Sequence, residues 1–192
     1  MAPHSLPGFG RLYVWTIIVL GVAVVAVSAV QLSAHPVPLQ QWFLLAALTL
    51  VSGSATVRLP SIQASISVSE TFVFTAVLLY GPAAGTLIVA LDGLVMSFWI
   101  AKRIREAHRA LFNMSAPALS AWTSAHLFFL VAGIVPLDLA PAGLDRILPA
   151  LVIFAATYFG LNSWLIAIAI STQTRTPPLT VWRNNFTWLS LN

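Results

Sequence analysis

Apolar runs long enough to cross a membrane constrain this chain more than any other feature. A helix needs roughly 20 consecutive apolar residues to span a hydrocarbon core about 30 Å thick. The sequence contains six candidate runs: 12–32, 41–56, 61–80, 83–101, 110–131 and 147–171. Charged residues make up only 7% of the chain, against roughly 25% in a soluble domain. The sequence therefore predicts an all-α membrane protein, a bundle of six transmembrane helices.

Length and motifs limit what else the chain can contain. Beside six spans, 192 residues leave no room for a separate soluble domain, so we expect a single integral membrane domain over residues 1–192. An aromatic, half-apolar stretch closes the sequence and resembles the start of another span, so we expect the chain to be part of a longer protein. The absence of cysteine excludes disulfides and thiolate chemistry. Catalytic, nucleotide-binding and local metal motifs are also absent, and we expect no enzymatic activity, no metal and no cofactor.

The basic residues indicate which way the spans run. Lys and Arg are retained on the cytoplasmic side of a membrane, whereas acidic residues matter little. With the N-terminus inside, six spans leave only Arg146 outside. The other eight basic residues then lie inside: Arg11, Arg58, Lys102, Arg103, Arg105, Arg109, Arg175 and Arg183. Both termini are therefore predicted to be cytoplasmic.

The net charge of +4 does not indicate a nucleic-acid partner. The densest basic cluster, 102–109, lacks the aromatic platform of a nucleic-acid reader and lies at the end of a span. Contact with anionic membrane lipid is the expected use of such a cluster.

The first apolar run has an alternative interpretation. Val27-Ser28-Ala29 is an acceptable cleavage site, so the run could be a signal peptide. Its apolar core exceeds the usual length of roughly 7–15 residues, which favours a retained span.

The segment 61–69 alternates serine or glutamine with apolar residues, which is the period of an extended chain. Ser67 and Glu70 then have the S-x-x-E spacing of a capping box, which predicts a helix that runs until Gly81-Pro82. Extended backbone at membrane depth survives only when it is buried in protein or lines a wet cavity. We therefore expect the third span to be broken or re-entrant at 61–67. The alternative is a solvated connector at the cytoplasmic surface.

Small residues recur at helical spacing after this break. Gly81 and Gly85 form one small-xxx-small pair, and Gly93 and Ser97 form another. Such pairs let helix backbones approach closely. They predict a helix-contact surface, either within the bundle or between the protomers of a homodimer.

Polar residues within the apolar runs suggest a ligand pocket. A charge at mid-membrane costs at least ~2.5–3.5 kcal/mol, so Asp92 should face the bundle interior, a partner or a ligand. The alternatives are a protonated Asp92 that bonds to a neighbouring span, a Glu70 that only caps its helix, and a His126 that only packs in the core. Tyr158 and Asn162 form a polar stripe that matters if it converges on Asp92. The predicted ligand-binding residues are Ser65, Ser67, Glu70, Asp92, Asn113 and His126.

Two families resemble this pattern. The run S-I-S-V-S-E-T-F-V-F-T-A-V-L-L-Y-G-P-A-A-G, the basic loop and the run R-A-L-F-N-M at 109–114 resemble the membrane sensory regions that precede GGDEF or HD-GYP domains in bacterial cyclic-di-GMP signalling proteins. The short helix ending in G-P-x-x-G, followed by a glycine-bearing helix with an acid, also resembles the S components of energy-coupling-factor vitamin transporters.

The first resemblance implies a non-enzymatic sensor in the bacterial inner membrane. It would bind a small-molecule ligand within its helices and signal to a cytoplasmic output domain or partner protein. The second implies a transporter subunit that binds substrate. A structural subunit of a larger membrane complex is the third alternative.

Overall fold

The computed structural model describes residues 8–54, 57–58, 65–66, 69–100 and 107–190. Seven helices account for nearly all of them, which confirms the all-α class. The helices are α1 (Gly8–Ala34), α2 (Leu39–Ser54), α3 (Ser69–Tyr80), α4 (Pro82–Ile100), α5 (Ala107–Ala132), α6 (Leu144–Thr174) and α7 (Pro178–Ser190). Two strands of two residues each, β1 (Val57–Arg58) and β2 (Ser65–Ile66), lie between α2 and α3.

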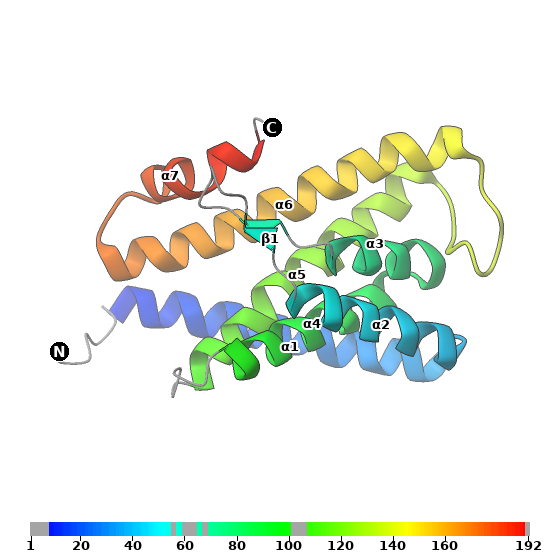
Figure 1. The fold of residues 1–192 in the computed structure, drawn as a ribbon, viewed down its shortest axis with the longest axis horizontal. Coiled ribbons are helices and arrows are strands. Elements are labelled where there is room, and N and C mark those ends of the chain that lie inside the picture. Colours follow the sequence, from blue (N-terminus) through cyan, green and yellow to red (C-terminus); the bar gives the residue numbers. More distant parts are fainter. Residues whose placement is uncertain (1–7, 55–56, 59–64, 67–68, 101–106, 191–192) are drawn as a thin grey trace.

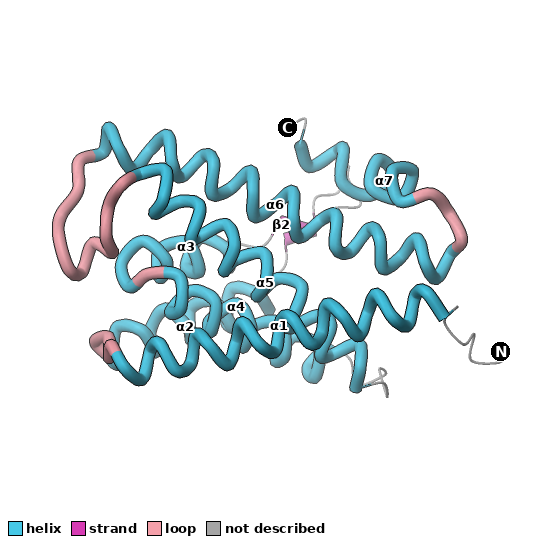
Figure 2. The backbone as a smooth tube through the Cα atoms, turned by 180° about the vertical axis from the view of Figure 1, so that it is seen from behind, coloured by secondary structure: helices cyan, strands magenta, loops and turns pink. Residues whose placement is uncertain are grey.

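Helix α5 lies at the centre of the bundle (Figure 1). It packs against α1, α4 and α6, and α4 also packs against α2 and α3. Helices α1 and α6 contact each other where α1 begins and α6 ends, and they diverge toward the other end, as the view from behind also shows (Figure 2). Helix α7 folds back along α6 and contacts it. Helix α5 thus links α1, α4 and α6, and α4 links this group to α2 and α3.

Two helices, α1 and α6, are long and apolar enough to cross a membrane. Three shorter apolar helices lie at Leu39–Gly53, Ser69–Tyr80 and Pro82–Phe98. Helix α3 has 12 residues and is roughly 18 Å long, less than the hydrocarbon core. A crossing by this segment would therefore need the residues that precede α3, and the six-span count stays a prediction.

Large apolar side chains cover the outside of the bundle. Phe9 is 73% exposed, Leu130 is 78% exposed and Val152 is 69% exposed. Small polar side chains lie inside instead. Six of these are fully buried: Ser28, Thr49, Thr86, Ser115, Ser120 and Ser124. A water-soluble fold shows the reverse preference, so this distribution fits an outer surface that faces lipid.

The predicted helix break at Gly81-Pro82 is confirmed. Gly81 has a φ of +90°, a conformation that glycine adopts without the steric cost of a side chain. Pro82 is the first residue of α4, where its missing N–H would be unpaired anyway. Gly81 is therefore a turn residue between two helices, and its predicted role as a helix-contact residue stays a prediction. The turn folds α4 back against α3.

The extended segment is described only in part. Ser65–Ile66 pairs antiparallel with Val57–Arg58, in the register Val57 to Ile66 and Arg58 to Ser65. An extended backbone is thus confirmed at these two residues. Most of the predicted re-entrant stretch, 61–64 and 67, lies outside the described residues, as does the capping residue Ser67.

Close helix approach depends on glycine at two crossings. A Cβ atom at Gly93 of α4 would overlap the backbone carbonyl of Asn113 in α5 and would lie 3.0 Å from Cα of Met114. A Cβ atom at Gly21 of α1 would overlap Ser115 of α5. Because backbone atoms occupy these positions, the helices would have to separate to admit a side chain.

Replacing Gly93 with alanine should lower the melting temperature in detergent, because the new methyl group would meet backbone that cannot rotate away. Gly160 of α6 is the matched control, since a Cβ atom there meets nothing within 4 Å. Gly160→Ala should leave stability unchanged or raise it, because alanine is the better helix former by roughly 0.8–1.0 kcal/mol. Equal melting temperatures for the two variants would contradict the close crossing of α4 and α5.

Candidate functional site

Two acidic residues lie on neighbouring helices of the bundle. Glu70 is in the first turn of α3, and Asp92 is in the middle of α4. They lie equally far along the chain from Gly81, so the hairpin brings them to the same level. Glu70 is exposed, and Asp92 is half-buried. The buried Tyr158 of α6 packs edge-to-face against Phe74, one turn after Glu70 on α3. We call Glu70, Asp92 and Tyr158 the acidic cluster.

Several oxygen atoms at the acidic cluster have no partner. Asp92 Oδ1 is buried without a hydrogen bond. Tyr158 is 5% exposed, and its hydroxyl makes no hydrogen bond to any residue that the structure describes. One turn along α6, Asn162 Oδ1 is also buried without a partner. A buried polar group without a hydrogen bond costs roughly 1–3 kcal/mol. The site therefore has unused capacity to bind.

Helix α2 leaves room for the acid. A Cβ atom at Gly53 would lie 2.8 Å from Asp92 Oδ1, so a side chain there would press on the carboxylate. Helices α2, α3, α4 and α6 thus all border the acidic cluster.

Asn113 serves a different contact. Its amide Nδ2 donates to Ser97 Oγ at 3.1 Å, and Ser97 Oγ donates to the carbonyl of Gly93 at 2.7 Å. This pair lies where α4 crosses α5, directly at the close approach of Gly93. Asn113 is therefore a helix-contact residue in this structure.

His126 is not brought to the acidic cluster. His126 is exposed, and its Nδ1 lies 2.8 Å from the carbonyl oxygen of Trp122 in its own helix. Its ring also packs against the Trp122 ring, with centroids 4.1 Å apart. Ser65 lies in β2, and Ser67 is outside the described residues. Of the six predicted residues, the structure places Glu70 and Asp92 at the same level of neighbouring helices.

One comparison with known proteins identifies the chain. The family model of MASE9 matches residues 15–192. The chain belongs to the MASE9 family. MASE9 is a family of membrane-associated sensory domains, so the expected membrane sensory character is confirmed at this level. No curated protein and no solved structure matches the chain.

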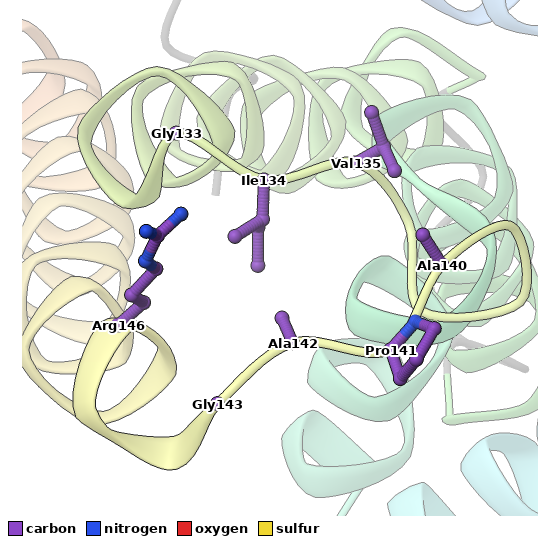
Figure 3. A pocket seen from close by; sticks show the side chains of 8 residues that line it. All are labelled: Gly133, Ile134, Val135, Ala140, Pro141, Ala142, Gly143 and Arg146. Atoms are coloured by element: carbon purple, nitrogen blue, oxygen red, sulfur yellow. The ribbon is translucent and has the colours of Figure 1, made fainter.

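A hollow of the MASE9 domain lies at the loop between α5 and α6 (Figure 3). It has a volume of about 570 Å³ and is lined by Gly133, Ile134, Val135, Ala140, Pro141, Ala142, Gly143 and Arg146. The Arg146 guanidinium projects into it beside Ile134. Arg146 forms no ion pair with the described residues. The hollow thus offers one positive charge among small and apolar side chains and exposed backbone.

The two sites of the MASE9 domain lie at opposite ends of α3. Backbone N–H groups of Leu137 and Asp138 donate to the carbonyls of Leu78 and Leu79 at 3.0 and 3.1 Å. These bonds fix the α5–α6 loop to the last turn of α3 and satisfy carbonyls that a helix end leaves free. Glu70 lies roughly 15 Å away, at the first turn. Several helices border the acidic cluster, whereas the Arg146 hollow is lined by the α5–α6 loop and the start of α6.

Proposed function

We propose that the chain is a non-enzymatic sensory module that binds a small ligand at the acidic cluster and signals to a cytoplasmic output domain. Membership of a family of membrane-associated sensory domains supports the sensory role. The observation that carries the site is Asp92, an acid in the middle of apolar α4 whose Oδ1 is buried without a hydrogen bond, with Glu70 at the same level on α3. Like charges in a low dielectric repel strongly, so a bound ligand that relieves this repulsion would change how α3 and α4 pack.

Helix α6 offers a route from the acidic cluster to the C-terminal helix. It carries Tyr158 at the cluster and Ser163 little more than a turn later. Ser163 Oγ accepts a hydrogen bond of 2.9 Å from Trp182 Nε1 of α7. The rings of Trp164 and Trp182 also stack, with centroids 5.8 Å apart and planes 10° apart. A ligand that shifts α6 would thus shift α7.

The proposed module crosses the inner membrane of a bacterium six times, with both termini in the cytoplasm. The arrangement of the helices supports this topology (Figure 1). The α1–α2 connection, the α3–α4 turn and the α5–α6 loop gather at one end, while α1 and α5 begin and α6 ends at the other. Arg146 belongs to the first end, whereas Arg11 and Arg175 belong to the second. The basic end would face the cytoplasm and contact anionic lipid.

Cysteine labelling tests the topology directly, because the native chain has no cysteine to interfere. We expect Ala140→Cys to react with an impermeant maleimide added outside intact cells, and Gln173→Cys to react only after the cells are opened. Both positions are exposed, so access depends on the side of the membrane. Labelling of Ala140→Cys only after opening would overturn the proposed orientation.

The reading frame beyond Asn192 distinguishes the sensor from a transporter. A GGDEF or HD-GYP domain in phase would support the proposed output. A stop codon beside genes for a transport ATPase would instead favour a substrate-binding transporter subunit.

Neutralising Asp92 tests the site. In the full-length protein, Asp92→Asn should raise the ligand concentration needed for half-maximal output by roughly 10- to 100-fold, the cost of one charge-assisted hydrogen bond. The readout is cyclic-di-GMP turnover in membranes. Asp145→Asn, an exposed acid at the start of α6, is the matched control and should leave the response unchanged. An unaltered response in Asp92→Asn would remove the acidic cluster from the mechanism.

A further inference from the structure

The Arg146 hollow has no part in the proposed function, yet it has the size and lining of a small-molecule site. Its volume of about 570 Å³ falls within the roughly 300–1,000 Å³ that is typical of ligand pockets. The half-buried side chains of Ile134 and Ala142 point toward each other across it, and Pro141 adds a further apolar surface (Figure 3). A ligand can therefore place an apolar body against these side chains.

Arg146 supplies the charge of the hollow. It is the third residue of α6, and its guanidinium projects into the hollow (Figure 3). It forms no ion pair with any acid in the described part of the chain. The acid next to it in the sequence, Asp145, lies with its Oδ1 beside Gly143. A guanidinium presents a planar fork of N–H donors that matches a carboxylate or a phosphate group, so Arg146 is suited to pair with an organic anion.

The start of α6 adds to the positive potential at this wall. Gly143 is the N-cap residue of α6, and no side chain caps the first turn. The N–H groups of Leu144 and Asp145 precede the first bond of the helix, which the Arg146 N–H donates to the Gly143 carbonyl at 3.2 Å. Such N–H groups carry partial positive charge at a helix N-terminus. The carboxylate of Asp145 offsets part of this charge without pairing with Arg146.

We propose that the Arg146 hollow binds an organic monoanion, whose carboxylate or phosphodiester group pairs with Arg146 and whose apolar body packs against Ile134 and Pro141. One guanidinium matches one negative charge, whereas a polyanion would leave charge unpaired beside apolar side chains. A free carboxylic acid and the headgroup of an anionic lipid share this chemistry. The inference goes beyond the proposed function, because this site does not involve the acidic cluster. Under the proposed topology, the hollow opens on the outer side of the membrane.

The hollow is joined to the helix core on two sides. Ile134 packs against a buried apolar cluster that joins α3, α5 and α6. The loop that forms the hollow is also bonded to the last turn of α3, through the N–H groups of Leu137 and Asp138. A ligand that draws Arg146 toward Ile134 would therefore move the start of α6 relative to α3 and α5.

Thermal unfolding of the purified full-length protein in detergent tests the proposal. Benzoate carries a carboxylate and an apolar ring, benzamide lacks the charge, acetate lacks the ring, and a short-chain phosphatidylglycerol represents the lipid source. At a tenfold excess over Kd, an anion that fits should raise Tm by roughly 3–6 °C, and benzamide and acetate should have no comparable effect. A rise with benzoate identifies a free carboxylic acid as the ligand class. A rise with phosphatidylglycerol alone identifies a lipid headgroup.

Three variants place the effect at the hollow. Arg146→Gln should weaken binding of the anion roughly 10- to 100-fold, because it removes a charge-assisted hydrogen bond. Arg146 is exposed, so the unliganded variant should melt as the wild type does. Ala142→Leu keeps the charge but fills the hollow, and it should also abolish the rise in Tm. The control Asp145→Asn removes a neighbouring acid and should bind the anion at least as tightly as the wild type does.

The proposal is overturned if neither benzoate nor phosphatidylglycerol raises Tm, or if acetate or benzamide raises it equally. A rise that persists unchanged in Arg146→Gln or in Ala142→Leu would overturn it as well. None of these results bears on the proposed function, because the hollow and the acidic cluster lie at opposite ends of α3 and are tested by different variants.

Discussion

Close contact between helix backbones is the constraint on which this bundle depends. In hydrocarbon, an apolar side chain gains little by leaving lipid for the protein interior, so helices associate through dense packing and a few hydrogen bonds. The chain follows this rule. Gly21 and Gly93 allow α1 and α4 to approach α5, and buried serines line the same interior. Many large apolar side chains remain on the outside, where contact with lipid would cost them little, although Phe128 and Phe154 are fully buried.

Dense packing also determines where the acids can lie. Gly81 and Pro82 reverse the chain within one residue, and Gly85 lets α4 press against Val77 of α3. A hairpin held this tightly keeps Asp92 at its level in the bundle. The cost of its buried, unpartnered oxygen must therefore be offset by protonation, by a partner or by a ligand. The unpartnered oxygens of Asp92 and Asn162 show that the described side chains do not complete this compensation.

Local features of this arrangement can be predicted from the sequence, because each depends on neighbouring residues. The helix break follows from Gly81-Pro82, and the unusual position of Asp92 follows from its apolar surroundings. The small-residue row is harder to interpret, since positions eight apart differ by about 80° around a helix. Gly85 accordingly faces α3 whereas Gly93 faces α5. Small residues that follow one another at regular spacing in α4 thus contact two different neighbouring helices.

The contacts between distant helices could not be predicted in the same way. Tyr158 and Asn162 share a face of α6, but spacing within one helix does not say which neighbour that face meets. His126 could have been excluded, since it lies two residues after the buried Ser124 and therefore about 200° around the helix. On α5, Ser120 and Ser124 are buried whereas Asn113 and His126 are exposed.

The position of α6 decides how a local event at the acidic cluster can reach the end of the chain. Tyr158 and Ser163 lie on one rigid helix, so the α6 backbone cannot move at the cluster and stay fixed at α7. The Trp182 indole bonds to Ser163 and stacks on Trp164, and both contacts require a defined rotation of α6. A small rotation that brings the Tyr158 hydroxyl closer to the acids would break or re-form these contacts together. In the proposed mechanism, the docking of α7 would therefore report the state of the cluster through α6 itself, without a chain of intermediate side chains.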